Sequence, residues 1–207
     1  MTAPVTQAPT PLTPTGPSRG TLELITIADL GDEVRAVIEG VETPPSPRHF
    51  VGMLMDRGMH LDAVKFLAHA LPRREAVWWV WVCARKSSGP TPKPAIKDAL
   101  DATERWIVQP TDQHRRQALT FGEVADFGTA AGCAALAAFM SGGSLAPPEA
   151  PPVPPGEFLT AKAVSGGVIL SAVATEPDKA PEKYQEFVKL GIEVAERTKL
   201  WPAETRT

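Results

Sequence analysis

The stretch that most constrains the fold is REAVWWVWVCAR, residues 74–85, which holds three of the five tryptophans of the chain in an otherwise apolar run. Successive residues of a helix point about 100° apart, so this segment, as a helix, is apolar on nearly every side. Such a helix is either buried or membrane-spanning. The apolar run is less than half of the ~20 residues that a membrane span needs. We therefore predict a helix that is buried inside a globular domain.

Two faces of this helix differ in the size of their side chains. Arg74, Trp78, Trp81 and Arg85 fall on one line, here called the aromatic stripe, while the opposite face carries alanine and valine and lets another helix approach closely. Arginines stacked over the tryptophans would hold the edge of the stripe by cation–π contacts. Tryptophan is highly buried on average, so the stripe is either part of the core or an exposed patch that binds a partner.

The remaining sequence has helical spacing of apolar residues and predicts an all-α domain. Residues 21–28, TLELITIA, have some strand character but no partner strand, so we expect an extended leader there. Ser46 and Thr111 are good N-caps, and Gly58 is a good stop. We predict a compact orthogonal or hairpin-stacked bundle of eight to nine helices. Apart from the tryptophan helix, the predicted helices are Leu30–Glu39, Arg48–Arg57, His60–Leu71, Lys93–Gln109, Thr111 to Phe127, Thr129–Ser141, Leu159–Thr175 and Glu182–Leu200.

Two segments are too rich in proline to be helical. Residues 1–20 cannot bury enough apolar surface to offset the entropy of ordering, so we predict a disordered tail. Residues 142–157, here called the proline arm, favour polyproline II structure. The arm would join the last two helices to the rest of a single helical domain over residues 21–207. Its first residues are Gly142, Gly143 and Ser144, whose backbone is conformationally free and whose amide groups are not covered by large side chains. Such residues fit either a segment that only ties the last two helices to the domain or a docking site.

Small residues predict one close helix pair. Gly128 and Gly132 precede the alanine-rich stretch CAALAAF, and SGGVILSAVA, residues 165–174, is its expected mate. Each stretch is too short to cross a bilayer. We therefore expect tight packing in a core and no stable membrane insertion.

The sequence carries no recognisable catalytic, cofactor or metal motif. Its histidines lack metal-ligand spacing, and Cys83 and Cys133 lack a CxxC partner, so we predict no metal, no cofactor and buried, reduced thiols. Asp62, Lys65 and His69 share a helix face, which is more typical of a solvated polar surface than of a proton relay. No known nucleophile or phosphate-binding motif occurs. We expect a non-enzymatic protein.

The net charge bears on which partners the chain can bind, and the N-terminal sequence bears on the compartment in which it is found. A net charge of -3 and a pI near 5.8 argue against a nucleic-acid surface. Arginine pairs such as Arg115-Arg116 are typical of solvated helix faces. The N-terminal residues lack the basic start and apolar core of a secretory signal, so we expect a cytoplasmic location.

Three stretches together resemble an uncharacterised family of helical bacterial proteins of about this size, associated with type VI secretion gene neighbourhoods. They are ALPRREAVWWVWVCAR, ERWIVQPTDQHRRQA and AAFMSGGSLAPPEAPPVPP, with LPxREAVWW and SGGSLAPP as their most specific motifs. The similarity covers about residues 47–174. The resemblance implies a bacterial cytoplasmic accessory protein, an adaptor or chaperone for secreted cargo, and brings no catalytic residue with it.

These observations leave three hypotheses for function. The first is a helical protein-interaction module that uses the aromatic stripe or the start of the proline arm to bind a protein partner. The second is a small-molecule or lipid-binding domain, enzymes included, in which the tryptophans form a pocket wall and Arg74 or Arg85 fixes an anionic group. The third is a self-assembling component that forms a homo-oligomer.

Overall fold

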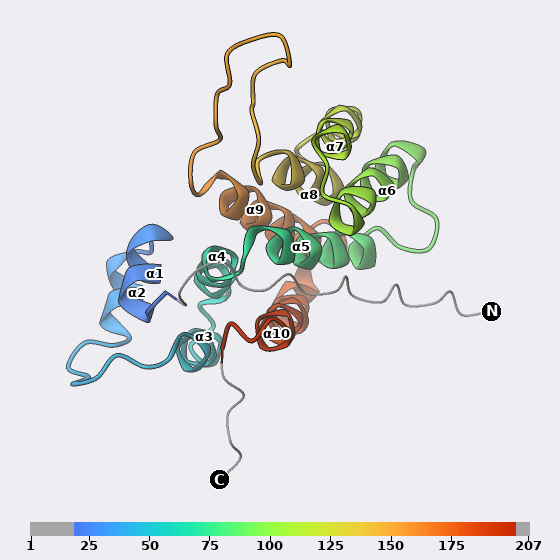
Figure 1. Cartoon of the computed structure of the whole chain (residues 1–207). Coiled ribbons are helices and arrows are strands. Elements are labelled where there is room, and N and C mark those ends of the chain that lie inside the picture. Colours follow the sequence, from blue (N-terminus) through green and yellow to red (C-terminus); the bar gives the residue numbers. More distant parts are fainter. Residues whose placement is uncertain (1–18, 202–207) are drawn as a thin grey trace.

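The computed structural model describes residues 19–201, and over that range the chain forms ten α-helices, one short 3-10 helix and no strand (Figure 1). The predicted all-α class is confirmed. The expected disordered tail lies outside the described residues, except for Arg19 and Gly20. The helices are α1 Thr21–Ile27, α2 Asp32–Ala36, α3 Pro47–Asp56, α4 His60–Ala70, α5 Arg73–Ser87, α6 Pro94–Val108, α7 Asp112–Ala125, α8 Ala130–Phe139, α9 Leu159–Val173, the 3-10 helix η1 Pro177–Lys179 and α10 Ala180–Arg197.

Helix α1 is the element that the sequence analysis assigned wrongly. Residues 21–28 were expected to be extended, but Thr21–Ile27 is helical and accounts for the tenth helix. Leu24 and Ile25 are fully buried, and α1 packs against α4. The Thr21 hydroxyl donates to the Pro45 carbonyl, 2.5 Å away. Tertiary burial of one helix face therefore overrides the β-branched composition of this segment.

The expected helix ends are confirmed where side chains form them. The Ser46 hydroxyl accepts from the His49 amide at 3.2 Å, and the Thr111 hydroxyl accepts from the His114 amide at the same distance. Gly58 ends α3 with a φ of 71°, a left-handed conformation that glycine adopts without strain.

Helix α5 lies in the middle of the bundle and is covered by α6, α8, α9 and α10. Its small face meets α9, where a methyl group on Gly167 would come within 2.4 Å of Val80 Cγ2 and 3.0 Å of Cys133 Cβ. The close approach predicted for this face, and the pairing of α8 with α9, are thus confirmed. Gly132 has a different role, because an added Cβ would lie 2.1 Å from the Asp126 carbonyl oxygen in the preceding turn.

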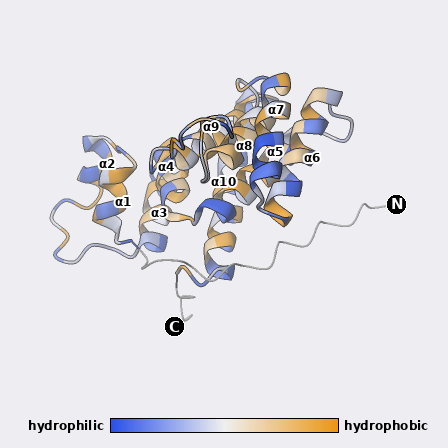
Figure 2. Cartoon of the chain, turned by 45° about the horizontal axis from the view of Figure 1, so that its top comes forward, coloured by the Kyte–Doolittle hydropathy of each residue, from blue (hydrophilic) through white to orange (hydrophobic). Residues whose placement is uncertain are grey.

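The last helix closes the other side of the core. Figure 2 shows apolar and polar residues alternating along α10, as its two faces turn toward and away from the bundle. Its buried face packs on α4, α5 and α9. Within residues 19–201, no helix combines the length and apolar composition that a bilayer crossing requires.

Candidate functional site

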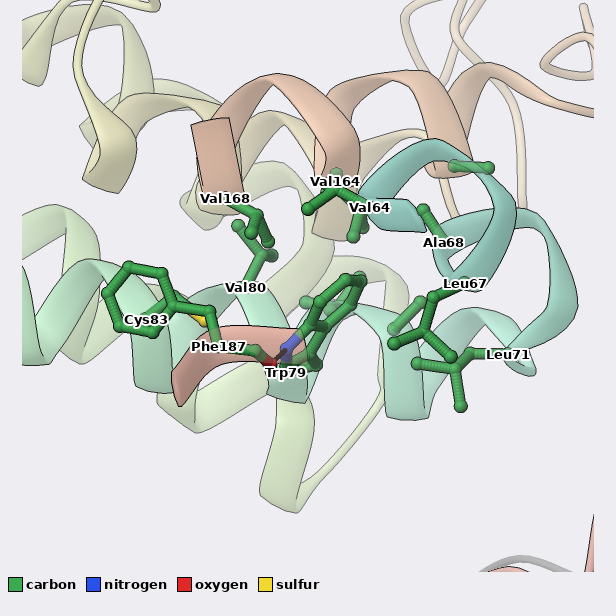
Figure 3. Packing of buried hydrophobic residues seen from close by; sticks show 14 of the residues in the cluster. Val64, Leu67, Ala68, Leu71, Trp79, Val80, Cys83, Val164, Val168 and Phe187 are labelled. Atoms are coloured by element: carbon green, nitrogen blue, oxygen red, sulfur yellow. Dashed lines mark hydrogen bonds between the residues drawn. The ribbon is translucent and has the colours of Figure 1, made fainter. Parts of the chain in front are cut away.

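Trp79 is the most deeply buried of the tryptophans and belongs to the core. Its side chain is fully buried, and its indole Nε1 donates to the Phe187 carbonyl of α10 at 2.7 Å (Figure 3). Figure 3 also shows Val80 beside Val168 of α9, while Leu67 and Leu71 lie around the indole of Trp79. The buried tryptophan helix is therefore confirmed, and this part of α5 packs against α4, α9 and α10.

The aromatic stripe faces α6. Trp81 is only 4% exposed, and its Nε1 donates to the Leu100 carbonyl at 3.0 Å. The predicted cation–π contact exists at one end, where the Arg85 guanidinium lies 5.5 Å from the centre of the Trp81 ring. At the other end Arg74 Nε donates to the Ile107 carbonyl at 2.7 Å. Trp81 and Arg74 thus attach α5 to α6, while Arg85 covers Trp81 from within α5.

Trp78 is the part of the stripe that reaches the surface, because its side chain is half-buried. Arg85 is exposed beside the buried Trp81. Three of the four stripe residues thus make hydrogen-bond or cation–π contacts within the domain. That Trp78 binds a partner stays a prediction.

The proline arm leaves the bundle between α8 and α9 and forms the long loop at the top of Figure 1. It turns back on itself, because the Ala150 amide donates to the Pro147 carbonyl at 3.0 Å. Lower down, the Leu145 amide donates to the Val153 carbonyl at 2.8 Å and joins the two sides. Residues 147–154, PPEAPPVP, are all exposed. The arm is a hairpin-like projection with a proline-rich tip.

Two arginines of α7 fix the start of the arm through its main chain. Arg115 Nη2 donates to the Ser144 carbonyl at 2.8 Å, and Arg116 Nη2 donates to the Ala146 carbonyl at 2.9 Å. The Asp112 carboxylate accepts from both guanidinium groups, which hold the pKa of Asp112 below its ordinary value. The solvated surface expected for this arginine pair is wrong for Arg115, which is 3% exposed and also donates to the Phe139 carbonyl at 2.8 Å.

The predicted arm residues Gly142, Gly143 and Ser144 lie at this fixed start. Gly143 has a φ of 66°, and an added Cβ would lie 2.9 Å from Arg115 Nε, so a side chain there would displace the guanidinium. Ser144 is half-buried, and its hydroxyl accepts from the Ala146 amide at 3.1 Å and the Val153 amide at 3.0 Å. These residues shape the arm rather than form its exposed tip.

The far end of the arm is fixed at the N-terminus of α5. Arg73 donates to the Ser141 carbonyl at 3.1 Å and to the Glu157 carbonyl at 3.3 Å. Since Ser141 directly precedes the arm and Glu157 is its last residue, one guanidinium bridges its two ends. Thr160 at the start of α9 donates to the Met140 carbonyl at 2.9 Å. Both ends of the arm are therefore anchored to the bundle.

A cavity of about 90 Å³, here called the basal cavity, lies beneath this anchored end. The residues that line it include Arg19, His69, Arg73, Glu157 and Phe158. It is separate from the aromatic stripe, since none of the four stripe residues lines it.

Other candidate chemistry is sparse in the part of the chain that the structure describes. No group of three or more histidine, cysteine, aspartate or glutamate side chains is placed to hold a metal ion there. Cys83 and Cys133 are free and buried, as expected, and burial raises the pKa of both thiols. The solvated face predicted for His69 is wrong, because this residue is 7% exposed.

The sequence reasoning missed the residues that anchor the arm and line the cavity. Arg73 and Arg115 looked like ordinary surface charges, and their partners are main-chain carbonyls, which leave no mark in the sequence. One signal was available, since an arginine pair, a glycine pair and a proline-rich segment all fall within the stretches quoted above. The sequence does not show that these features meet in space.

Comparison with models of protein families gives a match. Residues 50–195 match the model of a family described as a family of unknown function, DUF6931. The matched range runs from α3 into α10 and includes the whole proline arm. No curated protein and no solved structure matches the chain.

Proposed function

We propose that this chain, which belongs to the DUF6931 family, is a non-enzymatic protein-interaction module whose binding segment is the proline arm. The observation that carries the proposal is the contrast between the two parts of the arm. Its tip, residues 147–154, is exposed, while Arg73, Arg115 and Arg116 hold its base by main-chain carbonyls. A segment that only connected α8 to α9 would not need such an anchored projection.

The chemistry of the tip indicates what kind of partner fits it. The returning side, residues 151–155, has Val153 as its one residue with an amide N–H, and that N–H is already bonded to Ser144. The tip therefore presents proline rings, carbonyl oxygens and the half-exposed Val153, which is 51% exposed. Proline-rich segments of this kind are bound by grooves lined with aromatic side chains that also donate hydrogen bonds. We propose a protein partner with such a groove.

Anchoring would favour binding because the arm is ordered before the partner arrives. A free peptide of the same sequence loses conformational entropy when it binds, whereas the anchored arm has already lost most of it.

The biological setting follows from the resemblance described above. We propose a bacterial cytoplasmic accessory protein, an adaptor or chaperone of a secretion system of the type VI kind. In such a role the arm would bind one component of the secretion system, and the helical bundle would serve as the scaffold that holds the arm. Self-association through the same arm is the homo-oligomer alternative, and light scattering over a range of protein concentrations distinguishes it.

The test is affinity purification from native cells at mild and stringent salt. The wild-type chain is compared with the double variant Pro151→Ala/Pro152→Ala, which changes the exposed tip. The matched control is Pro90→Ala/Pro92→Ala, which changes two prolines in the loop between α5 and α6. We expect a stoichiometric partner with the wild type and the control, and its loss with the arm variant. Absence of any partner, or a partner retained by the arm variant, would refute the proposal.

A small-molecule or lipid-binding domain is the second candidate. The stripe tryptophans do not favour it, because Trp81 is covered by α6. The basal cavity does favour it, although its walls differ from those that the sequence suggested.

A further inference from the structure

We infer that the basal cavity is a binding site for a small tetrahedral oxyanion that carries a proton, with phosphate as the type ligand. This site would exist whether or not the proline arm has a partner, because it is formed by the bundle and by the anchored end of the arm.

Two helix N-termini meet at the cavity. Arg73 is the first residue of α5, while Thr160 and Ala161 are the second and third residues of α9, and all three line the cavity. Each helix is 15 residues long, and neither has a side-chain cap at its N-terminus. The first amides of a helix have no partner within the helix, and the helix dipole is positive there. Anions bind readily at such ends.

His69 supplies an independent sign of a ligand. It lines the cavity and is 7% exposed. Its Nδ1 lies 2.8 Å from the Lys65 carbonyl, which can only accept, so Nδ1 carries the proton. Burial lowers the pKa of His69, so the ring is neutral and Nε2 is a bare acceptor. Among the described residues, His69 Nε2 and Trp201 Nε1 are the buried side-chain atoms without a hydrogen-bond partner.

Charges around the cavity favour an anion. Arg19 and Arg73 line it, and Lys162 and Arg19 act on His69 as nearby positive charges. Two carboxylates oppose them: Glu157 accepts from Arg19 at 2.8 Å, and Glu23 lies 3.1 Å from the same guanidinium; both are largely exposed. Three positive charges, those of Arg19, Arg73 and Lys162, stand against these two carboxylates, so the surroundings of the cavity keep a net positive charge.

The neutral acceptor atom, His69 Nε2, decides which anion fits the cavity. Amide and guanidinium groups donate to ionised oxygens, but His69 Nε2 needs a donor from the ligand. Hydrogen phosphate offers both, because it is charged and still has a P–OH group at neutral pH. Sulfate is the same shape but has no proton to donate, so its oxygen would face the lone pair of Nε2. The cavity, at about 90 Å³, has room for one such ion.

The test is calorimetric titration of the full chain at pH 7.5 in an oxyanion-free buffer, with inorganic phosphate and with sulfate. We expect phosphate to bind at least roughly tenfold more tightly than sulfate, since a hydrogen bond to a charged group is lost with sulfate. Glycerol phosphate is titrated in parallel as a second control, because the second pKa of a phosphate ester is about 6 and its phosphate group has mostly lost its last proton at pH 7.5. We expect it to bind more weakly than inorganic phosphate, as sulfate does. Absence of binding by inorganic phosphate, or equal affinity for inorganic phosphate and sulfate, would overturn the inference.

Two variants locate the ion. His69→Ala should remove the preference for phosphate, whereas His49→Ala, an exposed histidine on α3, should keep it. Glu157→Gln removes one of the opposing carboxylates and should tighten phosphate binding several-fold, a gain that damage to the fold would not produce. If neither His69→Ala nor Glu157→Gln changes phosphate affinity, the ion binds elsewhere and the assignment is wrong.

Discussion

Arg115 Nη2 lies 2.8 Å from the carbonyl oxygen of Ser144, a contact that joins α7 to the start of the proline arm across 29 residues of sequence. The guanidinium is buried and stacks 4.6 Å from the centre of the Phe139 ring. One side chain therefore fixes both the end of α8 and the direction in which the arm leaves it.

Replacing this arginine should destabilise the domain and loosen the arm. We expect Arg115→Met to lower the free energy of unfolding by about 2–4 kcal/mol, because buried carbonyls lose their donors. Hydrogen exchange should show faster exchange of the Leu145 and Val153 amides. Arg57→Met, at the exposed residue that follows α3, should change neither quantity. If the Leu145 amide exchanges as slowly in Arg115→Met as in the wild type, Arg115 does not hold the arm in place.

Tryptophan fluorescence should separate the half-buried position of α5 from the buried ones. Trp79, Trp81, Trp106 and Trp201 are each at most 5% exposed, whereas Trp78 is half-buried. We expect blue-shifted emission with a small fraction that acrylamide quenches. Trp78→Phe should remove most of that fraction, and Trp81→Phe should leave it. Strong quenching that is lost with Trp81→Phe would mean that the aromatic stripe is exposed.

Adjacent glycines of α9 should respond in opposite directions to the same change. Gly167→Ala should destabilise the domain by about 1–3 kcal/mol, because the added methyl meets Val80 at 2.4 Å. Gly166→Ala should stabilise it by up to about 1 kcal/mol, because its nearest neighbour, Cys133 Sγ, would lie at 3.7 Å and alanine favours helix. Urea unfolding measures both. Equal effects of the two changes would contradict the close packing of α9 on α5.

The burial of His69 should make stability depend on pH in a defined direction. Its pKa is lowered in the folded state from an ordinary value of 6.5, mainly by burial. Below pH 6.5 the unfolded chain therefore binds more protons than the folded one, and stability falls as the pH falls. Urea unfolding in phosphate-free buffer at pH 7.5 and 5.5 should show this loss in the wild type. The loss of stability between pH 7.5 and 5.5 should be smaller in His69→Gln. If His69→Gln loses as much stability as the wild type, other groups are responsible.

The sequence predicted most helices because their periodicity and caps are local properties. Helix α1 was missed for the opposite reason: its local composition favours an extended chain, and only the burial of Leu24 and Ile25 against α4 makes it helical. The helical period placed Trp78 and Trp81 on one stripe correctly, but it could not show that α6 covers Trp81.

The candidate sites were harder to predict because they depend on contacts between distant segments. Arg115 binds Ser144, and Arg73 binds Glu157 across 84 residues of sequence. Main-chain carbonyls are present at every residue, so the sequence does not single out those that accept from arginine. The composition of the arm was visible, but its anchoring was not.

The most direct measurement is the affinity of the captured partner for the purified intact chain and for a synthetic peptide of residues 142–157. We predict that the intact chain binds at least about tenfold more tightly, because the anchored arm is already ordered, and that Pro151→Ala/Pro152→Ala abolishes binding in both forms. Equal affinity for chain and peptide would show that anchoring contributes nothing. Binding by the intact double variant would place the partner elsewhere on the domain and contradict the proposed function.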